Sequence, residues 1–139
     1  MNNLSISERR NGSVTVLDLQ GNIRLGEGNI ELHNVLRFLV EKGERRVLLN
    51  LAGVTYIDSS GLGELVAGYT TLQKHNGELK LLHLTVRVRE LMVITKLLTV
   101  FDVYEDETEA VNSFQEDSPN VETEPEAVIT GKLDNSLVA

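Results

Sequence analysis

Two hydroxyls, a carboxylate and two glycines gather within six residues, because positions 58–63 read Asp-Ser-Ser-Gly-Leu-Gly. The apolar run at residues 47–51 predicts a buried strand before them, and apolar residues at helical spacing predict a helix after them. The six residues therefore form a turn between a strand and a helix. A helix start carries unpaired backbone N–H groups and the positive end of the helix dipole, so this turn is suited to accept or tolerate negative charge.

A purely structural explanation accounts for part of the same turn. Asp and Ser are among the best N-capping residues, and Glu64 in the first helical turn suits the dipole. One cap does not require two serines, however, and Gly61 and Gly63 are poor helix formers. Their lack of a side chain suits a surface that another molecule approaches closely. These two features favour a contact site in addition to a cap.

The remainder of the chain divides into a nearly neutral body and an acidic end. Residues 1–104 hold 12 Lys and Arg against 11 Asp and Glu, whereas residues 105–139 hold one Lys against ten acids. From residue 115 the sequence is also broken by proline and poor in apolar residues, so it cannot bury enough surface to fold. We predict one domain at residues 1–114 and a disordered acidic tail at residues 115–139. The body has no basic stripe for nucleic acid.

Composition also restricts the location of the protein. The sequence has no Cys, no apolar run of membrane-spanning length and no signal-peptide layout at its start. We expect a cytoplasmic protein that does not contact membranes. The sequence leaves its oligomeric state open.

The periodicity of the body predicts a mixed α/β domain. Strands are expected at residues 4–8, 14–19, 47–51, 78–84 and 101–104, and Asn11-Gly12 between the first two is a strong hairpin signal. Helical faces are expected at residues 32–40, 62–75, 88–98 and 106–114. The later strand–helix–strand crossovers imply parallel pairing, and the opening hairpin is antiparallel. The prediction is a sheet of about five strands with about four helices.

Catalytic and cofactor sites find little support elsewhere in the sequence. His33, His75 and His83 lack metal-ligand spacing, and no third glycine completes a dinucleotide fingerprint. Ser60 is not flanked as in a nucleophile elbow, and helix geometry sends Asp58 and Glu64 in different directions. We therefore expect no catalytic residue, no metal ligand and no cofactor.

The turn at residues 58–63 resembles the signature of the STAS domain, in the branch of the bacterial anti-sigma factor antagonists. The resemblance extends from about Leu4 to Phe114 and includes residues 49–57 before the turn and residues 101–110 near the end of the body. It implies a partner-switching protein, which binds an anti-sigma factor that is also a serine kinase and so frees a sigma factor. The kinase phosphorylates a serine of the turn to abolish binding, and a serine phosphatase reverses the modification.

By position in the motif, Ser60 matches the phosphoacceptor of the family and Asp58 matches its preceding acidic residue. One departure is that the family often has an acidic residue after its second strand, where this chain has Arg24. The partner-binding residues implied by the resemblance are Asp58, Ser59, Ser60, Gly61, Leu62, Gly63, Asn22 and Arg24.

Two other functions remain open at the level of sequence. The chain could be a structural STAS subunit of a signalling scaffold or of a lipid-transport complex, or a nucleotide-binding STAS module that uses the helix start. Stable co-purification with a large complex would favour the first alternative, and titration with GTP or ATP would test the second.

Overall fold

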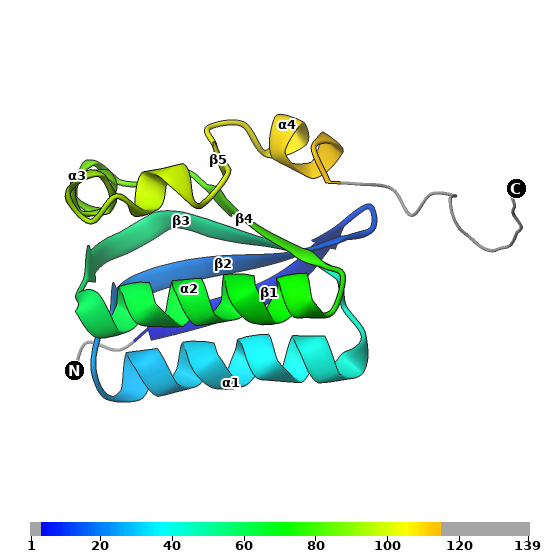
Figure 1. Cartoon of the computed structure of the whole chain (residues 1–139), viewed down its shortest axis with the longest axis horizontal. Coiled ribbons are helices and arrows are strands. Elements are labelled where there is room, and N and C mark those ends of the chain that lie inside the picture. The colour runs from blue at the N-terminus through cyan, green and yellow to red at the C-terminus, as the bar shows by residue number, and fades with distance from the viewer. Residues whose placement is uncertain (1–3, 115–139) are drawn as a thin grey trace, which may run out of the picture.

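The computed structural model describes residues 4–114, which form a five-stranded sheet with helices on both of its faces (Figure 1). The predicted acidic tail at residues 115–139 lies outside the described residues. None of the helices in residues 4–114 is long and apolar enough to span a bilayer. In chain order the elements are β1 (Leu4–Asn11), β2 (Val14–Ile23), α1 (Glu27–Lys42), β3 (Arg46–Ile57), α2 (Ser59–Lys74), β4 (Glu78–Leu82), α3 (Val86–Ile94), the 3₁₀ turn η1 (Leu97–Thr99), β5 (Val103–Tyr104) and α4 (Glu107–Asn112).

The strands lie in the sheet in the order β1-β2-β3-β4-β5, which is also their order in the chain. β1 and β2 form the expected antiparallel hairpin, and Gly12 in its turn has a left-handed backbone with φ of 64°. All later neighbours pair in parallel. The predicted mixed α/β class and topology are therefore confirmed.

Three strands are longer than the sequence predicts, and the first of them, β1, continues to Asn11. β2 continues to Ile23 and β3 continues to Ile57, because their pairing resumes after irregularities between residues 18 and 22. In the sequence, the glycine and polar residues at these positions are typical of strand ends. In the structure, the register shifts at these positions, and the two strands pair again beyond them. The extension brings both strands to the turn that precedes α2.

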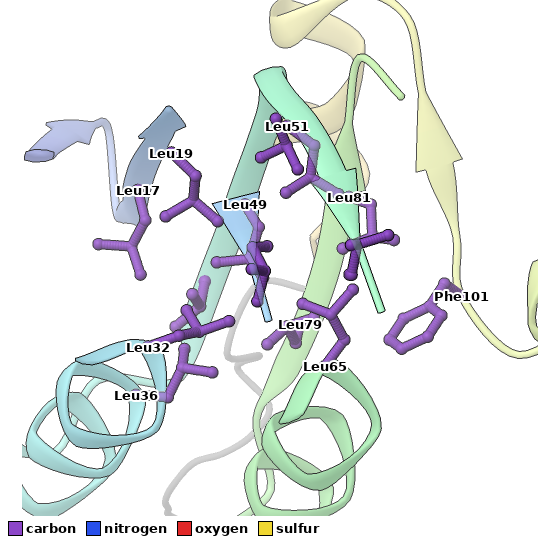
Figure 2. Packing of buried hydrophobic residues seen from close by; sticks show 14 of the residues in the cluster. Leu17, Leu19, Leu32, Leu36, Leu49, Leu51, Leu65, Leu79, Leu81 and Phe101 are labelled. Carbon is purple, nitrogen blue, oxygen red and sulfur yellow. The ribbon is translucent and has the colours of Figure 1, made fainter. Parts of the chain in front are cut away.

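The main core lies between the sheet and the paired helices α1 and α2 (Figure 1). Figure 2 shows leucines of these two helices facing leucines that alternate along the central strands. Alternate residues of a strand point to opposite faces, so the intervening residues of β2 and β3 lie on the other face of the sheet. There they pack with Ala110 and Phe114, at the α4 end of the domain, in a second apolar cluster.

A charged network joins α4 to the sheet, and we call it the α4 seam. The Arg9 guanidinium on β1 bonds Glu107 on α4 through two nitrogens, both at 2.8 Å, and also bonds Asp18 on β2 at 2.6 and 3.1 Å. Asn11 donates to Glu107 at 2.8 Å, and Asn50 donates to Asp18 at 2.8 Å. Each carboxylate of the seam thus has at least two side-chain donors.

Candidate functional site

Asp58 follows the last residue of β3 and is the N-cap of α2. Its Oδ1 accepts the backbone N–H of Gly61 at 2.9 Å, and its Oδ2 accepts the backbone N–H of Leu25 at 3.1 Å. The carboxylate therefore joins the start of α2 to the loop between β2 and α1. Burial alone would raise the pKa of Asp58, but bonds from the backbone N–H groups of Gly61, Leu25 and Ser60 outweigh it and lower the pKa.

Ser59 and Ser60 are the first two residues of α2, so residues 58–63, predicted as a turn before the helix, are its N-cap and first helical turn, and we call them the serine turn. Ser59 is exposed and Ser60 is partly exposed. Neither hydroxyl makes a hydrogen bond to another residue within 4–114, so capping is done by Asp58 alone. Two accessible hydroxyls are therefore available at the positive end of a 16-residue helix.

The two glycines of the turn have different roles. A Cβ on Gly61 would overlap the carbonyl oxygen of Ile23 and lie 2.7 Å from Ile57 Cγ1, whereas a Cβ on Gly63 would meet nothing within 4 Å. The sequence-based reason for Gly61, room for an approaching molecule, is therefore wrong: Gly61 is buried and makes room for β2. Gly63 is exposed, as that reason requires. Leu62 is 4% exposed and belongs to the main core.

Asn22 and Arg24 lie beside the turn, at the end of β2 and just after it. Asn22 pairs in register with Tyr56, and its Oδ1 accepts the Thr55 hydroxyl at 3.0 Å. The Arg24 side chain is exposed and lies over the Tyr56 ring, with its Cζ 5.7 Å from the ring centroid. The structure therefore brings both residues to the same end of the sheet as the two serines.

Four residues of this end were missed by the sequence analysis. Leu25 and Val86 are 76% and 74% exposed, Tyr56 is 38% exposed, and Arg87 lies over the Tyr56 ring at 5.9 Å. A signal for them does exist, because parallel strands place their carboxyl ends at one edge of the sheet. The segments that follow β2, β3 and β4 must therefore gather there.

A separate hollow of about 340 Å³ lies between α1 and α2. His33 Nδ1 and Glu64 Oε1 are 3.0 Å apart across it, and the apolar Leu36 and Val40 form part of its wall. Within residues 4–114, no group of three or more His, Cys, Asp or Glu side chains could hold a metal ion.

Comparison with known proteins agrees with this architecture. Residues 5–110 match the STAS domain family. BtrV of Bordetella bronchiseptica, a candidate anti-sigma factor antagonist, is 36% identical over 85 residues, which cover 61% of this chain and 73% of BtrV. The anti-sigma-B factor antagonist of Staphylococcus aureus strain NCTC 8325 is 36% identical over 75 residues, covering 54% of this chain and 69% of that protein.

The fold is similar to that of SpoIIAA from Bacillus, an anti-sigma factor antagonist and cell fate determinant. Its phosphorylated form superposes with a TM-score of 0.62 over 78% of this chain and 97% of SpoIIAA, at 17% identity. Its unphosphorylated form gives a TM-score of 0.60 over 78% of this chain and 96% of SpoIIAA. The matched family, the two relatives and the strand order together establish that this chain belongs to the STAS domain family, in the branch of the anti-sigma factor antagonists.

Proposed function

We propose that this protein is a regulatory binding module that acts in the cytoplasm, captures an anti-sigma factor when Ser60 is unmodified, and releases it when Ser60 is phosphorylated. The bound anti-sigma factor would itself be the serine kinase, and a serine phosphatase would restore the binding form. The observation that carries the proposal is the pair of unengaged, accessible hydroxyls at the start of α2, beside a carboxylate that already caps the helix.

The same geometry explains why the fold would survive modification. A phosphoryl group adds about −1.5 to −2 charges at neutral pH. Ser60 lies in the first turn of α2, where the helix dipole favours negative charge. The nearby Asp58 carboxylate is held by backbone N–H groups on both of its oxygens, so it is fixed in place. Phosphorylation would therefore change the surface of the turn more than its backbone.

A protein docked on the turn would respond differently. The phosphate is strongly hydrated, and it would have to be dehydrated in the interface without a matching cation on the partner. A mispaired buried charge costs about 2–5 kcal/mol, which corresponds to tens-fold to thousands-fold weaker binding. The proposed switch thus works by blocking the interface. An unchanged fold has a precedent in SpoIIAA, because its phosphorylated and unphosphorylated forms are both similar in fold to this chain.

The test uses the full chain, ATP and an anti-sigma factor kinase encoded in the same genome. We expect intact mass to show one added phosphate on the wild type and none on Ser60→Ala. The Ser60→Ala variant should bind the kinase as the wild type does, and Ser60→Asp should bind at least tenfold more weakly.

Ser59→Asp provides the matched control, because it places the same charge on the neighbouring hydroxyl position. If Ser60→Ala is phosphorylated and Ser59→Ala is not, Ser59 is the phosphoacceptor. Equal binding by Ser60→Asp and the wild type would contradict the proposal. Urea titrations of each variant would show that any loss of binding is not a loss of folding.

A further inference from the structure

Two arginines lie over one exposed tyrosine ring beside the serine turn. The Arg24 and Arg87 guanidinium carbons lie 5.7 and 5.9 Å from the centroid of the Tyr56 ring. Arg24 follows β2, Tyr56 is near the end of β3, and Arg87 is in the first turn of α3. Residues from three separate segments therefore form one group, which we call the Arg–Tyr cluster.

Backbone and side-chain bonds fix the cluster next to the turn. The Thr85 hydroxyl donates to the carbonyl of Val54 at 3.1 Å and accepts the N–H of Val88 at 3.3 Å, so it anchors the start of α3 on β3. The Leu25 N–H donates to Asp58, which holds the segment after Arg24 against the start of α2. These bonds join the segments that carry Arg24 and Arg87 to the strand and the helix start that carry Tyr56 and Ser60.

Neither arginine of the cluster has an acidic partner within residues 4–114, although both are exposed. By contrast, Arg9, Arg10, Arg37 and Arg89 each form an ion pair with a carboxylate. The cluster is also flanked by Leu25 and Val86, which are 76% and 74% exposed. Exposed arginine and tyrosine beside apolar side chains are the composition that carries most binding energy at protein interfaces.

We infer that the Arg–Tyr cluster binds an acidic segment of the protein partner and so extends the docking surface beyond the serine turn. This inference rests on the proposed function, because it assigns the chemistry of the same partner. The two positive charges are complementary to carboxylates on the partner. Leu25 and Val86 are complementary to apolar side chains next to those carboxylates. Complementary charge of this kind mainly selects the partner and speeds its association.

The cluster also bears on the switch. Both guanidinium groups lie over Tyr56, at the same end of the sheet as Ser60. A phosphate on Ser60 would compete with the carboxylates of the partner for these same two cations. Phosphorylation would therefore weaken binding of the partner in two ways. It would add charge repulsion at the serine turn, and it would occupy the arginines of the Arg–Tyr cluster that the partner needs.

The test measures the affinity of the anti-sigma factor kinase for full-length variants at two salt concentrations. We expect the double variant Arg24→Glu/Arg87→Glu to bind about tenfold to a hundredfold more weakly than the wild type at about 0.1 M NaCl. The difference should shrink at about 1 M NaCl, where the Debye length falls from about 10 Å to about 3 Å. The wild type should therefore lose more affinity with salt than the double variant.

The matched control is Arg37→Glu/Lys74→Glu, which reverses two exposed charges on α1 and α2 and changes the net charge equally. Its affinity should stay within about twofold of the wild type. An equal loss in this control would show a non-specific effect of net charge and would overturn the inference. A shift of the Arg24 and Arg87 side-chain NMR signals on titration of the isolated chain with ATP or GTP would assign the cluster to a nucleotide and would also overturn it.

The two proposals fail in different ways. If Arg24→Glu/Arg87→Glu binds as the wild type does while Ser60→Asp does not bind, the proposed function stands. The inference that the Arg–Tyr cluster binds an acidic segment is then refuted. If Ser60→Asp binds like the wild type, the proposed switch itself fails. Circular dichroism of the double variant should match the wild type, because both arginines are exposed and make no ion pair within the described domain.

Discussion

The serine turn and the α4 seam use charged and polar side chains in opposite ways. At the seam, one guanidinium satisfies two carboxylates, and Asn11 and Asn50 add further donors. At the serine turn, Asp58 is engaged only by backbone N–H groups, and both serine hydroxyls are unengaged among the described residues. Paired side chains hold one region together, and a packed backbone holds the other.

The difference teaches where to look for a binding surface in a small domain. Side chains that have satisfied one another gain little from a partner, because a partner would have to replace existing bonds. Unpaired side chains on an ordered backbone have bonds to offer, and the main chain that carries them does not have to be ordered on binding. The serine turn and the Arg–Tyr cluster meet this condition, and the α4 seam does not.

The largest expected effect comes from breaking the packed backbone of the serine turn. In Gly61→Ala the new Cβ would overlap the Ile23 carbonyl and lie 2.9 Å from Ile23 Cγ2, so β2 or α2 must move. We expect a loss of roughly 1–3 kcal/mol in the free energy of unfolding, measured by urea titration. Gly63→Ala meets open space and should instead gain up to about 1 kcal/mol from helix propensity. Equal effects of the two substitutions would contradict the different roles assigned to the glycines.

A second prediction compares the two helix caps. Asp58→Ala removes both acceptors that join α2 to the loop after β2, whereas Asp106→Ala removes one acceptor, for the N–H of Glu109 at 2.9 Å. We expect a destabilisation of about 2 kcal/mol for Asp58→Ala and about 1 kcal/mol for Asp106→Ala. Amide hydrogen exchange should show faster exchange at Leu25 in Asp58→Ala only. Unchanged exchange there would argue against the second bond of Asp58.

The smallest effect concerns the pH dependence of the α4 seam. Bonds from Arg9 and then Asn11 lower the pKa of Glu107 from 4.5 to about 2. A lowered pKa in the folded state contributes stability that is present above the unfolded pKa of 4.5 and is lost as the pH falls towards 2. Because Arg9 is about half exposed, we expect the contribution to be only about 1 kcal/mol.

Glu107→Gln is the variant that tests this pH dependence. Between about pH 5 and about pH 3, the free energy of unfolding of this variant should change less than that of the wild type. Glu105→Gln is a suitable control, because its carboxylate lies outside the seam and pairs with the exposed Arg89. An identical pH profile for the wild type and Glu107→Gln would contradict the lowered pKa of Glu107 in the folded state.

Much of the fold could be predicted from the sequence because each element carries its own local signal. Asn11-Gly12 indicated the hairpin, and leucines at helical spacing indicated α1. The ends of β2 and β3 were misplaced, because Gly21 and Asn22 in β2 and Gly53 in β3 break the apolar pattern without ending either strand. Register breaks of this kind depend on the neighbouring strand, which local periodicity does not describe.

The candidate site was predictable only in part for a similar reason. The serine turn is contiguous in sequence, so its residue types were visible directly. The Arg–Tyr cluster draws one residue from each of three segments, and no spacing rule joins residues 24, 56 and 87. The role of Gly61 was misread because the atom it accommodates, the Ile23 carbonyl oxygen, lies 38 positions earlier in the chain.

The order of the strands has a consequence for synthesis on the ribosome. Each strand from β2 onward pairs with the strand made just before it, so the sheet can grow by addition at one edge as the chain emerges. The closing step comes last, when Glu107 reaches Arg9 across 98 positions and α4 covers Val16 and Leu48. A nascent chain would leave that apolar strip exposed to chaperones and proteases until α4 had been made, and a prematurely terminated chain would leave it exposed permanently.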